Sequence, residues 1–127
     1  MKTLKFSAGK MLYGYLKEAI DVCGELKPEY AKEMFIRISK DYFKANIDLD
    51  CFSTLATQLY FELYKPHQLD AYDSELSRTL SHAAELSWYY KHRKDEKPNL
   101  SMYNRSIEIL KKYYQANFGW LKEKLKD

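Results

Sequence analysis

The C-terminal quarter of the chain constrains the fold most, because residues 99–126 have the apolar pattern of one long helix. A first apolar stripe recurs at gaps of three and four residues, which keeps its members on one side of a helix. It consists of Leu100, Tyr103, Ile107, Leu110, Tyr114, Phe118, Leu121 and Leu125, and we expect it to face the core. A second stripe, which we expect roughly opposite the first, consists of Met102, Ile109, Tyr113, Ala116 and Trp120. A helix that is apolar on two sides must be covered on two sides, either by its own domain or by another chain.

The remainder of the chain also has helical periodicity, broken by short polar connections. Apolar residues at helical spacing predict further helices over residues 7–23, 28–45, 49–64 and from 70 or 73 to 93. No segment of any length alternates apolar and polar residues as a strand does, and no hairpin turn signal is present. The sequence therefore predicts an all-α fold, a single-domain bundle of about five helices over residues 1–127 with a long C-terminal helix.

Capping residues indicate where these helices begin and end. Asp48 is a good N-cap for the helix that follows it. We expect Asn46 to take the left-handed position that often ends a helix. Pro66 is expected to end the third helix, because a proline restricts the residue before it. In the fourth helix, Tyr72 and Leu76 are expected to face the core together.

The composition is that of an ordinary globular protein. Of the 127 residues, 46% are apolar and 31% are charged, which suits one domain with a hydrophobic core. Cys23 and Cys51 are too few for a disulfide framework. No run approaches the roughly 18 apolar residues of a membrane span, and Lys10 and Lys17 interrupt any signal-peptide core. We therefore expect a cytoplasmic protein that makes no contact with a membrane.

Charge is distributed unevenly along the chain, although the net charge is only +3. Residues 41–75 contain two basic and seven acidic residues, a balance of −5, whereas residues 91–127 contain ten basic and five acidic residues, a balance of +5. The two segments either attract each other within the fold or present an acidic patch to a basic partner.

Several apolar and acidic side chains are candidates for binding a partner protein. Phe61 points into the polar side of its predicted helix, so a neighbouring helix covers it or a partner does. The candidate residues are Asp48, Asp50, Phe61, Met102, Ile109, Tyr113 and Trp120. The partner is another protein or a second copy of this chain. A homodimer would use the second apolar stripe, where the burial of Trp120 decides between core and interface.

A polar face on the fourth predicted helix offers an alternative, a metal site or an active site. Its members follow one another at spacings of four, three, four and three residues: Arg78, His82, Glu85, Tyr89 and His92. A histidine and a glutamate three residues apart can share a metal ion in a helical bundle. Arg78 and His82 also resemble the arginine–histidine pair of HEPN-type helical ribonucleases, at a shorter separation. A solvated helix face explains the same pattern, and we favour that interpretation.

Other functional classes have weaker support. The basic run Lys91, Arg93, Lys94 and Lys97 follows Trp88, Tyr89 and Tyr90, a combination that can bind single-stranded nucleic acid. Asp95 and Glu96 interrupt that run, which favours a solvated loop over a nucleic-acid site, and Trp88 is expected at the edge of the core. The chain contains no glycine-rich phosphate loop, no GxSxG and no HExxH. We therefore predict no catalytic residue, no metal and no cofactor, and an enzyme is the less favoured reading.

The segment from Asp41 to Tyr64 carries a family resemblance. It contains Asp41-Tyr42-Phe43, then Asn46-Ile47-Asp48-Leu49-Asp50, then Phe52 and a helix rich in leucine and aromatic residues. This stretch resembles the turn between helices in small bacterial self-protection immunity proteins of the colicin D type. The resemblance implies a non-enzymatic helical protein that binds and inhibits a partner protein, in the manner of an immunity protein or antitoxin.

Overall fold

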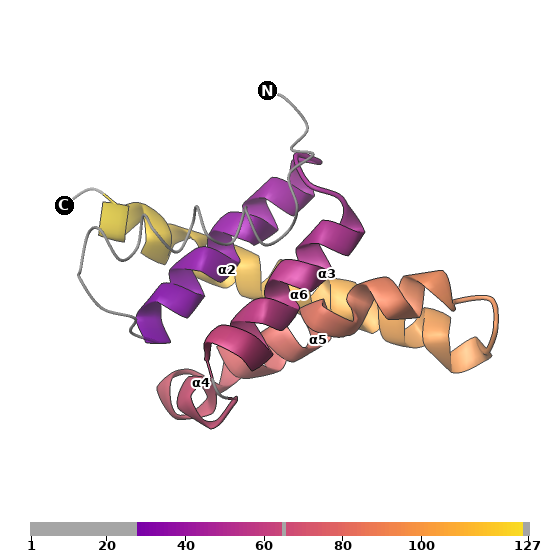
Figure 1. The fold of residues 1–127 in the computed structure, drawn as a ribbon. Helices are drawn as coiled ribbons and strands as arrows, with labels where there is room; N and C mark the ends of the chain where they lie inside the picture. Colours follow the sequence, from indigo (N-terminus) through magenta and orange to yellow (C-terminus); the bar gives the residue numbers. More distant parts are fainter. Residues whose placement is uncertain (1–27, 65, 126–127) are drawn as a thin grey trace.

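The structure, a computed structural model, describes residues 28–64 and 66–125 and is all-α over that range (Figure 1). Its elements are α2 (Pro28–Phe43), α3 (Leu49–Thr57), the π-helical turn η1 (Gln58–Leu63), α4 (Pro66–Tyr72), α5 (Ser74–Lys91) and α6 (Lys97–Leu125). The predicted all-α fold with a long C-terminal helix is confirmed, and the described residues contain no strand. The predicted helix over residues 7–23, with Cys23, lies outside the described residues.

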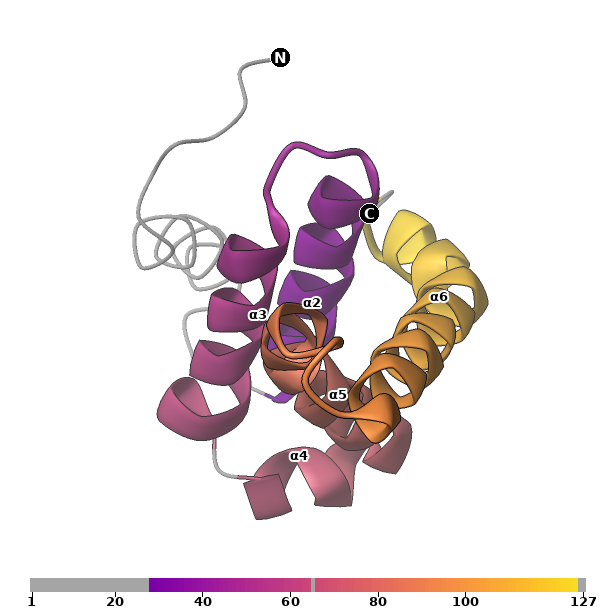
Figure 2. The ribbon, with the colours of Figure 1, turned by 90° about the vertical axis from the view of Figure 1, so that its right-hand side faces the viewer.

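The helix α5 lies at the centre of the arrangement. The helix α3 packs against one side of it, and α6 runs antiparallel along another side (Figure 1 and Figure 2). The helix α2 closes the core by packing against α3 and α6. The far end of the α5–α6 hairpin extends beyond α2 and α3. The large buried side chains of this core include Tyr30, Met34, Phe35, Ile38, Phe52, Leu55, Leu59, Leu69, Leu76, Leu80 and Leu86.

A serine occupies the contact point between α3 and α5. The Ser53 hydroxyl donates a hydrogen bond to the Ala83 carbonyl oxygen at 2.8 Å and accepts one from the Ser87 N–H at 3.1 Å. Positions 83 and 87 carry the carbonyl and the amide that an α-helix normally joins directly. The buried Ser53 side chain therefore satisfies backbone groups of α5 while its small size lets the two helices approach closely.

Aromatic rings fill the space where α2 meets α3 and α6. The ring centroids of Tyr42 and Phe52 are 4.6 Å apart, and Phe35 lies 6.2 Å from Phe52 and 6.0 Å from Tyr113. Burial and the neighbouring Tyr103 hydroxyl raise the pKa of Tyr42 to about 12, so this tyrosine stays uncharged at neutral pH. Tyrosine suits such half-buried positions because its ring is apolar and its tip is polar.

The segment after η1 differs from the sequence prediction. Pro66 begins a separate short helix, α4, because proline is tolerated in the first turn, where an N–H would have no partner. Asp73 then interrupts the helical path in an extended conformation. Tyr72 and Leu76 consequently do not share a stripe: Tyr72 is 43% exposed and Leu76 is fully buried.

The helix α2 ends in a Schellman turn. The Asn46 N–H donates to the Asp41 carbonyl oxygen at 2.8 Å, and the Ala45 N–H donates to the Tyr42 carbonyl oxygen at 3.0 Å. Ala45 has a φ of 61°, so it holds the left-handed position. The prediction that Asn46 takes this position is wrong by one residue. Asn46 instead donates its side-chain amide to Asp41 Oδ1 at 3.3 Å.

The helix α6 is buried along a line between its two apolar stripes. The buried residues on this line are Asn99, Ser106, Leu110 and Tyr113. At about 100° per residue, the stripe centres are only about 130° apart, so the two stripes are flanks of one broad face and not opposite sides. The predicted position of the first stripe in the core is wrong for Leu100, which is 46% exposed. The side chains of Leu121 and Leu125 lie outside the described set.

The left-handed alanine predicts a stabilising substitution. Ala45→Gly should raise the free energy of unfolding by about 0.5–1 kcal/mol, because glycine reaches a positive φ without the steric cost of a Cβ. Urea denaturation measures the change. The control is Ala116→Gly at a solvent-exposed position within α6, where the same substitution should cost about 1 kcal/mol. A loss of stability in both variants would contradict the assigned turn.

The register of α6 predicts unequal effects of two leucine truncations. Leu110→Ala should cost about 2–5 kcal/mol because Leu110 is fully buried. Leu100→Ala should change the free energy of unfolding by no more than about 0.5 kcal/mol. Chemical denaturation of both variants distinguishes them. Similar losses of stability in both variants would instead indicate that the first stripe faces the core.

Candidate functional site

A groove of about 330 Å³ runs between α3 and α5. It is lined by Asp50, Ser53, Thr54, Thr57, Ala84, Ser87, Trp88 and Lys91. Trp88 is 54% exposed and does not pack against the core, so the expectation of a core-edge residue is wrong. Phe61, a predicted partner-binding residue, is 61% exposed and follows Thr57 by four residues, about one helical turn. Trp88 therefore places an exposed aromatic ring at this polar groove, and Phe61 is a second exposed ring further along the same helical segment.

Asp50 is held at one end of this groove by side chains of α5. It accepts a short hydrogen bond from the Ser87 hydroxyl, and its Oδ1 lies 3.0 Å from Lys91 Nζ. The hydrogen bonds from Ser87 and Lys91 lower the pKa of Asp50. Asp48 lies beside it as the N-cap of α3, where its carboxylate accepts from the Cys51 N–H at 2.7 Å. Both predicted acidic residues therefore lie at the start of α3.

Sequence reasoning missed the hydroxyl residues of this groove. In the sequence, Ser53 directly follows Phe52 and Ser87 directly follows Leu86. A small polar residue next to a large apolar one is a signal of a close helix crossing. That signal could have paired the two helices. It could not have shown that the Trp88 side chain is exposed beside this crossing, because the exposure of such a side chain depends on how the neighbouring helix is placed.

The predicted polar face of α5 does not converge on one point. His82 Nδ1 lies 3.0 Å from Ser106 Oγ on α6, and the Tyr89 hydroxyl donates to Glu85 Oε2 at 3.1 Å. His92 Nδ1 lies 2.7 Å from Asp95 Oδ2 in the following turn. Arg78 is exposed nearer the start of the helix. Among the described residues, no three His, Cys, Asp or Glu side chains gather closely enough to hold a metal ion.

Two members of the second apolar stripe of α6, Tyr113 and Trp120, contact other helices of the same chain. Tyr113 is only 5% exposed, and its hydroxyl donates to Asp73 Oδ2 at 3.1 Å. Burial and the Asp73 carboxylate raise the pKa of Tyr113. Trp120 is half-buried, with Lys32 Nζ 4.5 Å from its ring centroid. The hypothesis of a homodimer through this stripe therefore loses Tyr113 as a contact residue, while Met102 and Ile109 are half-buried.

Asp73 joins three helices at the start of α5. Its Oδ1 accepts from the N–H groups of Glu75 and Leu76 at 3.1 Å each, which caps α5. Its Oδ2 accepts from Tyr113 on α6 and lies 4.0 Å from Lys32 Nζ on α2. One carboxylate thus fixes where α2 and α6 meet the N-terminus of α5.

Several basic side chains near the end of the α5–α6 hairpin have partners within the chain. Lys91 pairs with Asp50, and the Arg93 guanidinium lies 3.9 Å from the ring centroid of Tyr90. Trp88 and His92 have ring centroids 4.5 Å apart. Lys94 and Lys97 are exposed. Lys91 and Arg93 are therefore engaged by Asp50 and Tyr90 of the same chain, which leaves the exposed Lys94 and Lys97 as the other basic residues of the predicted run.

Comparisons with family models, with characterised proteins and with solved structures found no match to this chain. The resemblance of residues 41–64 to colicin D-type immunity proteins therefore stays a prediction. Within the part of the chain that the structure describes, no helix has the length and apolar character needed to cross a membrane.

The two aspartate caps should differ in their effect on stability. Asp48→Ala should cost about 1 kcal/mol through the loss of one capping hydrogen bond. Asp73→Ala should cost about 2–3 kcal/mol, because it also leaves the buried Tyr113 hydroxyl without its acceptor. Chemical denaturation measures both losses. Tyr113→Phe in the Asp73→Ala background should then cost less than it does alone, and strict additivity would argue against the coupling.

His82 should make stability depend on pH. Burial and the guanidinium groups of Arg78 and Arg105 lower its pKa, outweighing the opposite effect of Glu85. Below the unfolded value of about 6.5, the unfolded chain therefore binds more protons than the folded chain, and stability falls as the pH drops towards the folded pKa.

Urea denaturation at several pH values between about 7 and 5 measures this dependence. His82→Gln should reduce the loss of stability across that window. His67→Gln, on an exposed position of α4, is the matched control and should leave the loss in place. An unchanged pH dependence in His82→Gln would rule out His82 as its source.

Proposed function

We propose that this chain is a non-enzymatic protein that binds a partner protein through the surface formed by α3, η1 and α5. The observation that carries the proposal is the exposure of two large aromatic side chains, Trp88 in the lining of a polar groove and Phe61 in η1, which continues α3 beyond that groove. Tryptophan is enriched among the residues that dominate binding energy at protein interfaces, and aromatic side chains in general are enriched there. Exposed aromatic rings beside polar groups also fit the anatomy of such interfaces, with an apolar centre and a polar rim.

The proposed partner has a basic surface. Asp48 lies at the start of α3, and the segment 41–75 has seven acidic and two basic residues, a surplus that the pairs Asp50–Lys91 and Asp73–Lys32 neutralise only in part. Complementary charge accelerates association and selects among partners. An immunity or antitoxin-like inhibitor of a basic toxin is the most specific form of this proposal, and it draws on the resemblance of residues 41–64.

The first experiment places a photo-crosslinking phenylalanine analogue at position 61, 88 or 72 in the full chain, expressed in its source cells. We expect one defined partner to be captured at positions 61 and 88. Position 72 is the matched control, because Tyr72 is also an exposed aromatic residue, on α4 instead of the proposed surface. Equal capture at position 72 would argue against a specific surface.

The second experiment measures affinity for the purified partner. The double variant Phe61→Ser, Trp88→Ser should weaken binding at least about tenfold, and Tyr72→Ser should leave it unchanged. Both substitutions are at exposed positions, so the unfolding midpoint should change little. Retained affinity in the double variant would overturn the assignment of the surface. Light scattering distinguishes the alternative, a homodimer, by the mass of the purified protein.

The immunity form has its own test. The captured partner should arrest growth when it is expressed alone, and co-expression of this chain should restore growth. The double variant should fail to restore it. A partner that does not harm cells would leave the binding surface in place and overturn the inhibitory role.

A further inference from the structure

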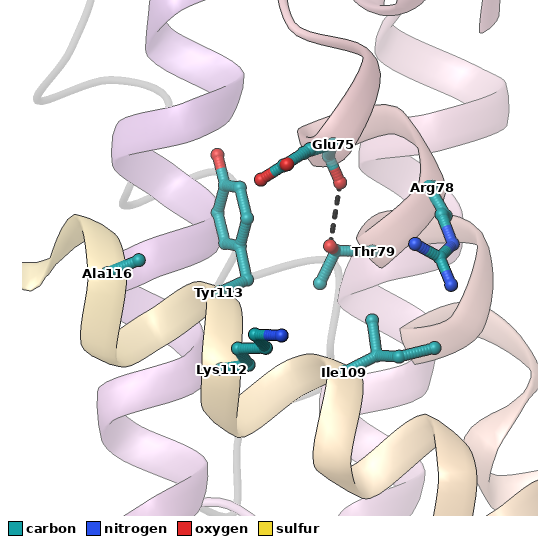
Figure 3. A pocket seen from close by; sticks show the side chains of 7 residues that line it. All are labelled: Glu75, Arg78, Thr79, Ile109, Lys112, Tyr113 and Ala116. Carbon is teal, nitrogen blue, oxygen red and sulfur yellow. Dashed lines mark hydrogen bonds between the residues drawn. The ribbon is translucent and has the colours of Figure 1, made fainter.

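A hollow of about 260 Å³ lies between α5 and α6, close to the start of α5 (Figure 3). It is separate from the groove between α3 and α5. Its lining residues are Glu75, Arg78, Thr79, Ile109, Lys112, Tyr113 and Ala116. Ligand pockets for drug-sized molecules usually have volumes of about 300–1,000 Å³, so this hollow suits a smaller molecule.

Two cationic side chains border the hollow from opposite helices. Figure 3 shows the Arg78 guanidinium of α5 and the Lys112 ammonium of α6 turned towards the space between the helices. Among the residues that the structure describes, neither head group has a hydrogen bond or an ion pair. A guanidinium offers paired N–H donors that match the two oxygens of a carboxylate.

Glu75 limits the charge that the hollow accepts. Its carboxylate lines the same space, so two positive charges and one negative charge leave a balance of +1. The neighbouring Asp73 and Lys32 lie 4.0 Å apart and cancel each other. A bound monoanion brings the lining to neutrality, whereas a bound phosphate dianion would leave a net charge of −1 and loses more hydration on entering the hollow.

Apart from Thr79, whose hydroxyl donates to the Glu75 carbonyl oxygen at 2.7 Å, the remaining lining is largely apolar and already held in place. Ile109 and Ala116 supply aliphatic surface beside the ring of Tyr113. The Tyr113 hydroxyl is engaged by Asp73 at 3.1 Å, which fixes the ring that forms this wall. A short hydrocarbon chain fits against this wall, and burial of its apolar surface away from water stabilises the bound state.

We propose that the hollow between α5 and α6 binds a small organic monocarboxylate, with the carboxylate on Arg78 and Lys112 and the apolar body against Ile109 and Ala116. The proposal does not depend on the partner-binding surface. A free fatty-acid fragment, an aromatic acid and a hydroxy acid share this chemistry.

The experiment is a titration of the full chain, labelled with ¹⁵N, with hexanoate, followed by amide chemical shifts. Saturable shifts are expected at Thr79, Ile109 and Tyr113, while amides of the α3–α5 groove stay in place. Inorganic phosphate and hexanol serve as comparison ligands, which lack the apolar body and the charge respectively. Both should bind at least about tenfold more weakly than hexanoate.

Matched variants assign the charge contact. Arg78→Gln should weaken hexanoate binding about tenfold, and Lys112→Gln should weaken it several-fold. Lys111→Gln is the control, because it removes the same charge from the adjacent exposed position outside the hollow. Glu75→Gln should narrow the preference for hexanoate over phosphate. The proposal is overturned if shifts do not saturate, if phosphate binds as tightly as hexanoate, or if Lys111→Gln matches Lys112→Gln.

Discussion

The hydrogen bonds of the Ser53 hydroxyl fix how α3 crosses α5, and the positions of the other helices follow from that crossing. A buried hydroxyl that bonds both a carbonyl and an amide of the opposing backbone favours one register of this crossing, because sliding of α3 would leave the buried Ser53 hydroxyl without its partners. Once α3 occupies that side of α5, another side is left for α6. The helix α2 then covers the apolar flanks that α3 and α6 turn towards each other.

Tyrosine has a structural role at these helix boundaries. Tyr42 and Tyr113 are on α2 and α6, and each places a ring among other aromatic residues and a hydroxyl near a polar neighbour. A leucine core alone would fill the same volume without the polar contacts. Where two helices meet near solvent, a side chain contacts both apolar and polar groups, and tyrosine suits both with its ring and its hydroxyl. This requirement partly explains the high tyrosine content of the chain.

Helical periodicity predicted the fold class and the approximate extent of α2, α3, α5 and α6, because burial of one face repeats at a period that a sequence displays. It could not predict α4, since Pro66 is compatible with ending one helix and with beginning another. It also misplaced the buried line of α6. Two apolar flanks about 130° apart resemble two stripes, and the polar residues Asn99 and Ser106 between them gave no sign of burial.

Candidate sites were harder to predict than helices, because they depend on side chains from different elements. The sequence singled out Asp50 and Phe61, which lie on the continuous helical segment of α3 and η1, but it did not associate Asp50 with Trp88, which lines the same groove. The polar face of α5 was visible as a spacing pattern. Its members nevertheless found separate partners in Ser106 and Asp95, because each is near a different neighbour along the helix.

The π-helical turn η1 has an evolutionary consequence. A π-helical turn closes its hydrogen bonds over one more residue than an α-helical turn, so a single inserted codon can create one without interrupting the helix. The residues before the turn keep their core contacts, and those after it are rotated around the axis. Phe61 lies within η1, so a mutation of that size could have altered the exposed surface at one step while leaving Phe52 and Leu55 packed as before.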